Sequence, residues 1–318
     1  MTASYLASSD RGTALATALI ALAAIGFGMV PYFAKSLTDS GMSPAAIAFY
    51  RYALAAVALL PFLALRRADL RTTLWGIVAG AAIGLGWVGY VAALKTVPVA
   101  TAGVLYMTYP VFTIAIAWAG FRVVPTIRAL IAAMMILVAA AVVLSPGAVS
   151  IGQLPAALIA LGAPIGFGFG INVLTHKLIR IAVLSRIAAI SLGALIGLTP
   201  VLAQLDFASI LPASTGDWWL IGGIAVVTAI VPQLIYTVFA PRIGAARSAI
   251  AGSFELPAMF FIAWAALDEV ILPVHFLAAA LVLTAIAITP SRPARTVFPA
   301  SPPDAARQAA SSHWKDRP

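Results

Sequence analysis

The chain has 318 residues, of which 63% are hydrophobic and only 9% are charged, with a mean hydropathy of +1.05 and a formal net charge of +9. Soluble domains carry roughly 25% charged residues, so this composition excludes a soluble protein and predicts an integral membrane protein. Cysteine is absent and the three histidines form no ligand-spaced pair, which excludes disulfides and thiolate metal sites, and we expect no metal and no cofactor.

The apolar runs are about 20 residues long, the length of a membrane-spanning helix. In chain order they predict five helices at 13–33, 44–65, 72–94, 98–121 and 126–144, then five more at 153–174, 181–202, 218–240, 245–267 and 273–289. We therefore expect an all-α membrane protein with ten transmembrane helices. Residues 1–12 form a short polar N-terminus, and the Pro-, Ser- and Arg-rich segment 291–318 is typical of a disordered tail.

Two sequence echoes indicate that the second half is a copy of the first. In the stretch 158–170, residues 158–168 echo residues 19–28, with one inserted residue at Pro164. Pro110 and Pro257 lie 147 positions apart, and this offset also pairs Thr101 with Ser248, Thr108 with Glu255 and Arg122 with Glu269. These echoes predict two five-helix repeats, at 13–145 and 153–290.

Positive charge predicts the orientation of the helices. With the N-terminus inside, the inner segments hold 16 Lys and Arg residues, whereas the outer connections hold only Lys35 and Lys95. Both termini are then cytoplasmic, and the protein lies in the cell inner membrane. The net charge thus reflects topology, and we expect no nucleic acid partner. Because each repeat has an odd number of helices, the two copies are inverted, which is the structural basis of alternating access.

Several motifs resemble the ten-helix EamA-type exporters of the drug/metabolite transporter superfamily. They are Ala48-Phe-Tyr-Arg51, Thr101-Ala-Gly with Tyr109-Pro110, and Ser248-Ala with Leu256-Pro257 and Asp268-Glu269. The resemblance spans roughly residues 13–289. It implies small-molecule export, often of amino acids, and aromatic amino acid exporters are among the members of this family. The family's Gly-Glu-like helix end is kept by Glu269, but Arg122 stands at the matching position of the first repeat.

Two charged residues lie within predicted helices. Glu255 lies near the centre of helix 245–267, where an ionised side chain costs at least ~2.5 kcal/mol unless it is paired, hydrated or protonated. It is a candidate partner for a substrate amine or a proton-coupling group; alternatively, it holds helices together through hydrogen bonds. Arg51 is a candidate for binding a carboxylate or pairing with Glu255, although an arginine near a helix end often snorkels to the surface.

Aromatic and amide side chains predict a mostly apolar central cavity with a few polar groups. The candidate substrate-binding residues are Trp87, Tyr90, Tyr106, Tyr109, Asn172, Gln233 and Tyr236, beside Glu255 and Arg51. Taken singly, each also fits an interhelical hydrogen bond or an interfacial belt position.

Glycines and prolines are candidates for packing and gating. Glycine recurs every fourth residue in two ladders, Gly76, Gly80 and Gly84, and Gly162, Gly166 and Gly170. Such spacing favours close helix packing and, as a hypothesis, sliding contacts during gating. Pro110, Pro164 and Pro257 are candidates for bending or breaking helices, or for marking helix boundaries.

The favoured function is export of small metabolites, most of all aromatic or other neutral amino acids, through this cavity. The alternative is efflux of hydrophobic cationic drugs, which one buried acid and several aromatic rings also suit. An enzyme is disfavoured because the spans contain no nucleophile–base pair, metal cluster or phosphate-binding motif. A channel is disfavoured by the inverted repeat. Substrate identity, energy coupling and oligomeric state stay open.

Overall fold

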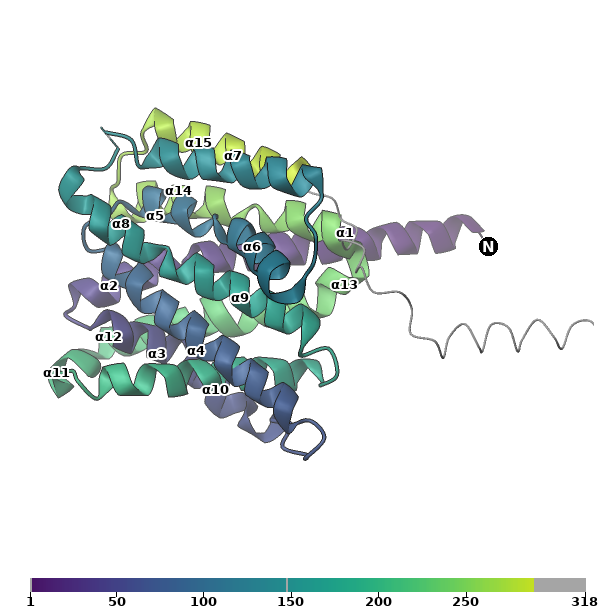
Figure 1. Cartoon of the computed structure of the whole chain (residues 1–318), viewed down its shortest axis with the longest axis horizontal. Helices are drawn as coiled ribbons and strands as arrows, with labels where there is room; N and C mark the ends of the chain where they lie inside the picture. The colour runs from purple at the N-terminus through teal and green to yellow at the C-terminus, as the bar shows by residue number, and fades with distance from the viewer. Residues whose placement is uncertain (1, 147, 289–318) are drawn as a thin grey trace, which may run out of the picture.

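The structure, a computed structural model, describes residues 2–146 and 148–288, so the predicted tail at 291–318 lies outside the described residues (Figure 1). Within these two ranges every element is helical. Seven of the described segments are long and apolar enough to cross a bilayer: Gly12–Asp39, Pro44–Phe62, Leu70–Ala93, Val99–Phe121, Ile151–His176, Val183–Leu202 and Thr215–Ala240. Three shorter apolar helices accompany them, Ile127–Val143, Glu255–Leu267 and Pro273–Ile288. The chain is therefore an all-helical, multi-pass membrane protein.

The elements divide at the gap at residue 147 into a first and a second half. The first half contains α1 (Thr2–Gly28), α2 (Val30–Asp39), α3 (Pro44–Leu59), η1 (Leu60–Phe62), α4 (Leu70–Ala93), α5 (Val99–Tyr106), α6 (Tyr109–Phe121) and α7 (Ile127–Val143). The second half contains η2 (Ile151–Gln153), α8 (Leu154–Ala160), α9 (Gly162–His176), α10 (Val183–Leu202), α11 (Phe207–Ile210), α12 (Thr215–Ala225), η3 (Val226–Ile230), α13 (Val231–Gly252), α14 (Glu255–Leu267) and α15 (Pro273–Ile288). Segment η3 is a π-helix.

Four helices that the sequence predicts as continuous are interrupted. The breaks lie at Met29, at 107–108, at Leu161 and at 253–254. Each is followed, within the first turn of the next helix, by a proline: Pro31, Pro110, Pro164 and Pro257. Proline lacks an N–H and cannot donate to the preceding turn, so it fits the first turn of a new helix. The structure thus places the three predicted prolines directly after breaks.

Two boundaries differ most from the prediction. Helix α1 begins at Thr2, within the segment expected to be a polar terminus, and α13 continues across 241–244, where a loop was expected. Polar residues before Thr13 do not by themselves end a helix. Pro241 removes only the hydrogen bond of its own missing N–H, so α13 can continue past it.

The two halves pack against each other along their length (Figure 1). Helix α4 packs on both α9 and α10, α1 packs on α13, and α7 lies beside α15. One buried core cluster draws residues from both halves, including Tyr52, Trp87 and Leu256. The fold therefore brings segments from far apart in the sequence to a shared interior.

The predicted glycine ladders lie where helices cross. A Cβ on Gly80 would clash with the carbonyl oxygen of Ile190 in α10, and one on Gly84 would lie 3.2 Å from Ala194 Cα. On the other face of α4, Gly86 and Ala82 meet Gly162 and Gly166 of α9. Absence of a side chain at these points lets the backbones approach closely, so the ladders set the spacing of α4 from its neighbours.

Helices α6 and α14 have the same build in the two halves. Each has 13 residues, and each ends at a left-handed residue, Arg122 (φ 56°) or Asp268 (φ 52°). The next N–H donates to a carbonyl six residues back, from Val123 to Ala117 at 3.0 Å and from Glu269 to Ala263 at 2.9 Å. These positions are 146 residues apart.

The predicted alignment of the two repeats matches Pro110 with Pro257, an offset of 147 residues. In this segment that alignment is therefore wrong by one residue. Pro110 is the second residue of α6, whereas Pro257 is the third residue of α14. By helix position Glu255 corresponds to Tyr109, and Arg122 corresponds to Asp268 and not to Glu269. Prolines are tolerated at several positions in a first turn, so they do not fix the register.

Candidate functional site

Arg51 on α3 is held by the second half. Its guanidinium Nη2 donates to the carbonyl oxygen of Thr228 at 3.2 Å, and the side chain is only 6% exposed. Thr228 lies in the π-helix η3, whose wider turn releases carbonyl groups from the regular α-helical ladder. Nε and Nη1 of Arg51 have no hydrogen-bond partner. The arginine therefore does not snorkel to the surface but enters the interior between the halves.

The guanidinium stacks on aromatic rings. Cζ of Arg51 lies 4.0 Å from the centroid of the Trp87 ring and 5.5 Å from that of Tyr52. Delocalised guanidinium groups are weakly hydrated and are attracted to aromatic faces, most strongly to tryptophan. This contact compensates part of the cost of burying the charge.

The four predicted aromatic residues of the first half form one cluster. Trp87 on α4 lies 5.0 Å from Tyr90 and 5.4 Å from Tyr106, measured between ring centroids, and Tyr106 lies 5.9 Å from Tyr109 across the break in the α5–α6 helix. Phe167 on α9 joins them, 5.1 Å from Tyr109 and 5.9 Å from Tyr106. Phe167 was not predicted as a site residue, although it stands in the repeated Gly-Phe-Gly stretch.

Glu255 is the first residue of α14, at the break after residue 254. It is half-buried, and its charge interacts with Arg51 and with the hydroxyl groups of Tyr90, Tyr109 and Tyr236. It receives no hydrogen bond from Arg51, since Nη2 is bonded to Thr228 and the other two nitrogens have no partner. The structure therefore places the acid, the arginine and the aromatic cluster in one region, without the direct Arg51–Glu255 pair considered from the sequence.

The remaining predicted site residues have different surroundings. Asn172 is buried, and its Nδ2 donates to the carbonyl oxygens of Thr113 and Gly168, both at 2.9 Å. Its amide hydrogens thus join α9 to α6. Tyr236 packs its ring 5.8 Å from that of Phe27, and Gln233 is half-buried in the first turn of α13.

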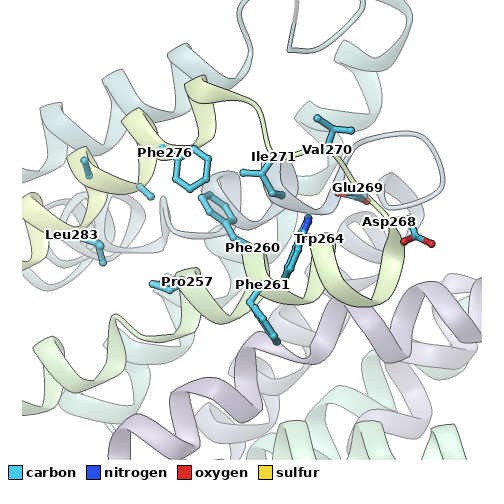
Figure 2. A pocket seen from close by; sticks show the side chains of 12 residues that line it. Pro257, Phe260, Phe261, Trp264, Asp268, Glu269, Val270, Ile271, Phe276 and Leu283 are labelled. Atoms are coloured by element: carbon cyan, nitrogen blue, oxygen red, sulfur yellow. The ribbon is translucent and has the colours of Figure 1, made fainter.

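A separate cavity of about 930 Å³ lies between α14 and α15 (Figure 2). Its lining is mostly aromatic and aliphatic, and it has two acidic residues at one end: Pro257, Phe260, Phe261, Trp264, Asp268, Glu269, Val270, Ile271, Phe276, Ala279, Ala280 and Leu283. Phe261, Trp264 and Phe276 are each more than 60% exposed. No pattern in the sequence distinguishes these aromatic residues, because exposed apolar side chains are expected wherever a membrane helix faces lipid.

Glu269 connects the end of this cavity to the first half. Its carboxylate accepts hydrogen bonds from the backbone N–H groups of Val99, at 3.0 and 2.8 Å, and Ala100, at 3.4 Å. Burial raises the pKa of the Glu269 carboxyl above its ordinary value, while these hydrogen bonds and the charge of Lys35 oppose the increase. The acid that the family resemblance singled out therefore caps helix α5.

A second contact between the halves lies beside this cap. The backbone N–H of Leu272 donates to Nδ1 of His275 at 3.1 Å, and Nε2 of the same ring lies 3.0 Å from Oγ1 of Thr101. With Nδ1 accepting, a neutral ring carries its proton on Nε2 and donates to Thr101. Among the described residues no group of three His, Asp or Glu side chains is placed to hold a metal ion.

Comparisons with known proteins agree with this architecture. No curated protein matches the chain. A solved structure described only as "Crystal structure of protein" matches with a TM-score of 0.59 and 15% sequence identity, covering 86% of this chain and 96% of that chain. At this identity the match shows a shared fold. Residues 14–145 match the model of the EamA-like transporter family, so the first half of this all-helical membrane protein is similar to an EamA-like transporter domain.

Proposed function

We propose that the protein is an alternating-access exporter of small metabolites, most of all aromatic or other neutral amino acids. The observation that carries the proposal is the meeting of Arg51, Trp87 and Tyr106 from the first half with Glu255 and the π-helix η3 from the second. A basic group, an acidic group and aromatic rings at the junction of two halves suit a zwitterion with an apolar side chain. The broken helices beside them resemble the discontinuous helices that form substrate sites in secondary transporters.

The inverted repeat is part of this proposal and is supported by matching contacts. Cβ atoms on Gly26 and Gly166, equivalent in the sequence echo, would clash with the carbonyl oxygens of Val227 and Ala82 respectively. A Cβ on Gly28 would likewise lie 3.3 Å from the backbone nitrogen of Met259, and one on Gly168 would lie 2.9 Å from that of Thr113. Thr113 and Met259 are 146 residues apart, as are α6 and α14. These equivalent contacts support two copies of five helices, ten in all. The proposed location in the cell inner membrane rests instead on the distribution of Lys and Arg along the sequence.

The test is uptake of labelled amino acids into liposomes that contain the purified protein, with and without a pH gradient. We expect saturable uptake with cross-competition among aromatic and branched amino acids. Replacing Glu255 by Gln separates two roles: if the acid couples transport to protons, accumulation against a gradient is lost while exchange of substrate survives. Leak without saturation contradicts the proposal and favours a channel.

Efflux of lipophilic cations is a second candidate function, favoured by the cavity between α14 and α15. Its aromatic lining has Asp268 and Glu269 at one end, an arrangement that suits a cation with an apolar body (Figure 2). Competition among lipophilic cations in the same liposomes, with no effect of amino acids, would replace the first proposal by this one.

A further inference from the structure

Unsatisfied polar atoms gather at one place in the interior. The described buried side-chain polar atoms without a hydrogen-bond partner are Nε and Nη1 of Arg51 and the hydroxyl oxygen of Tyr90. Tyr90 is 0% exposed and Arg51 6%. Buried polar groups in folded proteins almost always have a partner, so an exception of this kind calls for an explanation, such as a functional role in binding a further group.

These two side chains contact the same ring. Cζ of Arg51 lies 4.0 Å from the centroid of the Trp87 ring. The centroid of the Tyr90 ring lies 5.0 Å from that of Trp87, in an edge-on arrangement. The single anchor of Arg51, through Nη2 to Thr228, fixes the group while its other nitrogens stay uncommitted. A fixed guanidinium and a phenol therefore offer several N–H and O–H donors around one aromatic ring.

We propose that Arg51 and Tyr90 bind the carboxylate group of the transported molecule. A carboxylate accepts hydrogen bonds only, and it matches the planar donors of arginine with the tyrosine O–H as a further donor. Glu255, whose charge interacts with both residues, is then the partner for the ammonium group. This inference rests on the proposed function and narrows its substrate class to molecules that carry both a carboxylate and an ammonium group. An amine without the carboxylate leaves Arg51 unpaired and adds a like charge beside it.

The position of Arg51 between the two halves links carboxylate binding to their relative movement. Arg51 is anchored to η3 of the second half but projects from α3 of the first, so a relative movement of the halves changes how many of its donors face the ligand. A carboxylate that completes the set of hydrogen bonds stabilises one arrangement over the other, which is what a transported substrate must do.

The test compares matched pairs of ligands that differ only in the carboxylate: L-phenylalanine with phenethylamine, and L-leucine with isoamylamine. Binding is measured on the purified full-length protein by the shift in melting temperature, and transport by uptake into liposomes. We expect Arg51→Gln to weaken amino acid binding at least tenfold and Tyr90→Phe to weaken it several-fold, with amine binding unchanged or improved. Arg51→Lys should restore part of the loss. Tyr50→Phe serves as the control, since Tyr50 lies on the same helix as Arg51 but packs its ring on Trp218.

Tyr90→Phe removes one oxygen atom and keeps the ring, so it tests the inference even if the arginine variants fail to fold. Equal losses for the amino acid and its amine in the Tyr90 variant overturn the inference, as does an unchanged affinity for both. Binding that depends on Tyr90 and the carboxylate, without any uptake, supports the site and contradicts the exporter. Saturable uptake of amino acids that is insensitive to Tyr90 supports the exporter and contradicts the site.

Discussion

The carboxylate of Glu269 accepts hydrogen bonds from the backbone N–H of Val99, which lies 170 residues earlier in the chain. Helix α5 begins after Pro98 and has no side-chain cap of its own. The second half of the protein thus supplies the cap for a helix of the first half, and the negative charge lies at the positive end of the helix dipole. Together with the hydrogen bond between His275 and Thr101, this cap connects α5 to the segment between α14 and α15 and to the first turn of α15.

Removing the cap should destabilise the protein. We expect Glu269→Ala to lower the free energy of unfolding by about 1 kcal/mol, since two N–H groups of α5 lose their acceptor. Glu269→Gln should cost less, because its amide oxygen can still accept. Asp268→Asn is the matched control in the adjacent position. A melting temperature for Glu269→Ala equal to that of the control would show that the cap is not needed.

The same residue predicts a pH dependence. Burial raises the pKa of Glu269 in the folded protein, so between its ordinary and its raised pKa the folded state binds a proton that the unfolded chain releases. The protonated Glu269 carboxyl therefore contributes its whole share of the free energy of unfolding below its ordinary pKa. This share is lost as the pH rises through the raised pKa of the folded state. Thermal unfolding of the wild type and of Glu269→Gln over about pH 4 to 7 should differ in slope, with the variant lacking this component. Parallel curves would contradict it.

The positions of Arg122 and Asp268 test the inverted repeat. Both are exposed and end equivalent helices, so inversion places them on opposite sides of the membrane, with the arginine inside as the positive-inside rule requires. Because the natural chain has no cysteine, single cysteines can be introduced without further changes. An impermeant thiol reagent should label Asp268→Cys from outside intact cells and Arg122→Cys only after the membrane is opened. Labelling of both from one side would exclude the inverted arrangement.

Close packing of α4 on α10 predicts a difference between two glycines. A methyl group on Gly80 meets the Ile190 carbonyl oxygen, whereas one on Gly120 has nothing within 4 Å. Forcing the helices apart should cost about 1–3 kcal/mol in Gly80→Ala, while Gly120→Ala should be neutral or slightly stabilising. Melting temperatures in detergent provide the comparison. Equal stability of the two variants would mean that the α4–α10 contact is looser than the structure indicates.

Asn172 should act through structure and not through substrate binding. Both amide hydrogens are used, one of them across to Thr113 on α6, so Asn172→Ala should lower stability by roughly 0.6 kcal/mol, the average for such bonds in membrane proteins. The KM for substrate should stay unchanged. Gln204→Ala is a suitable control, since that amide, in the turn just after α10, donates to the carbonyl oxygen of Pro200 four residues earlier and joins no second helix. A raised KM with unchanged stability would contradict this prediction and support a role of Asn172 in substrate binding.

Composition and periodicity alone predict much of this protein. Apolar runs of bilayer length indicate an all-helical membrane protein because unsatisfied backbone groups are excluded from lipid, and the distribution of Lys and Arg predicts its orientation. The contact of Trp87 with Tyr90 was also readable, since residues three apart on one helix share a face. Tyr106 and Tyr109 contact each other as predicted, although a helix break lies between them.

Only the tertiary structure decided which predicted residues meet, because contacts between distant segments depend on the packing of both halves. Periodicity does not reveal that Arg51 bonds to a π-helical carbonyl 177 residues later, that Glu269 caps α5, or that the amide of Asn172 is already committed. The helix breaks and the one-residue register shift between Pro110 and Pro257 were hidden for a related reason. A proline marks the first turn of a helix, but backbone geometry decides where that turn begins.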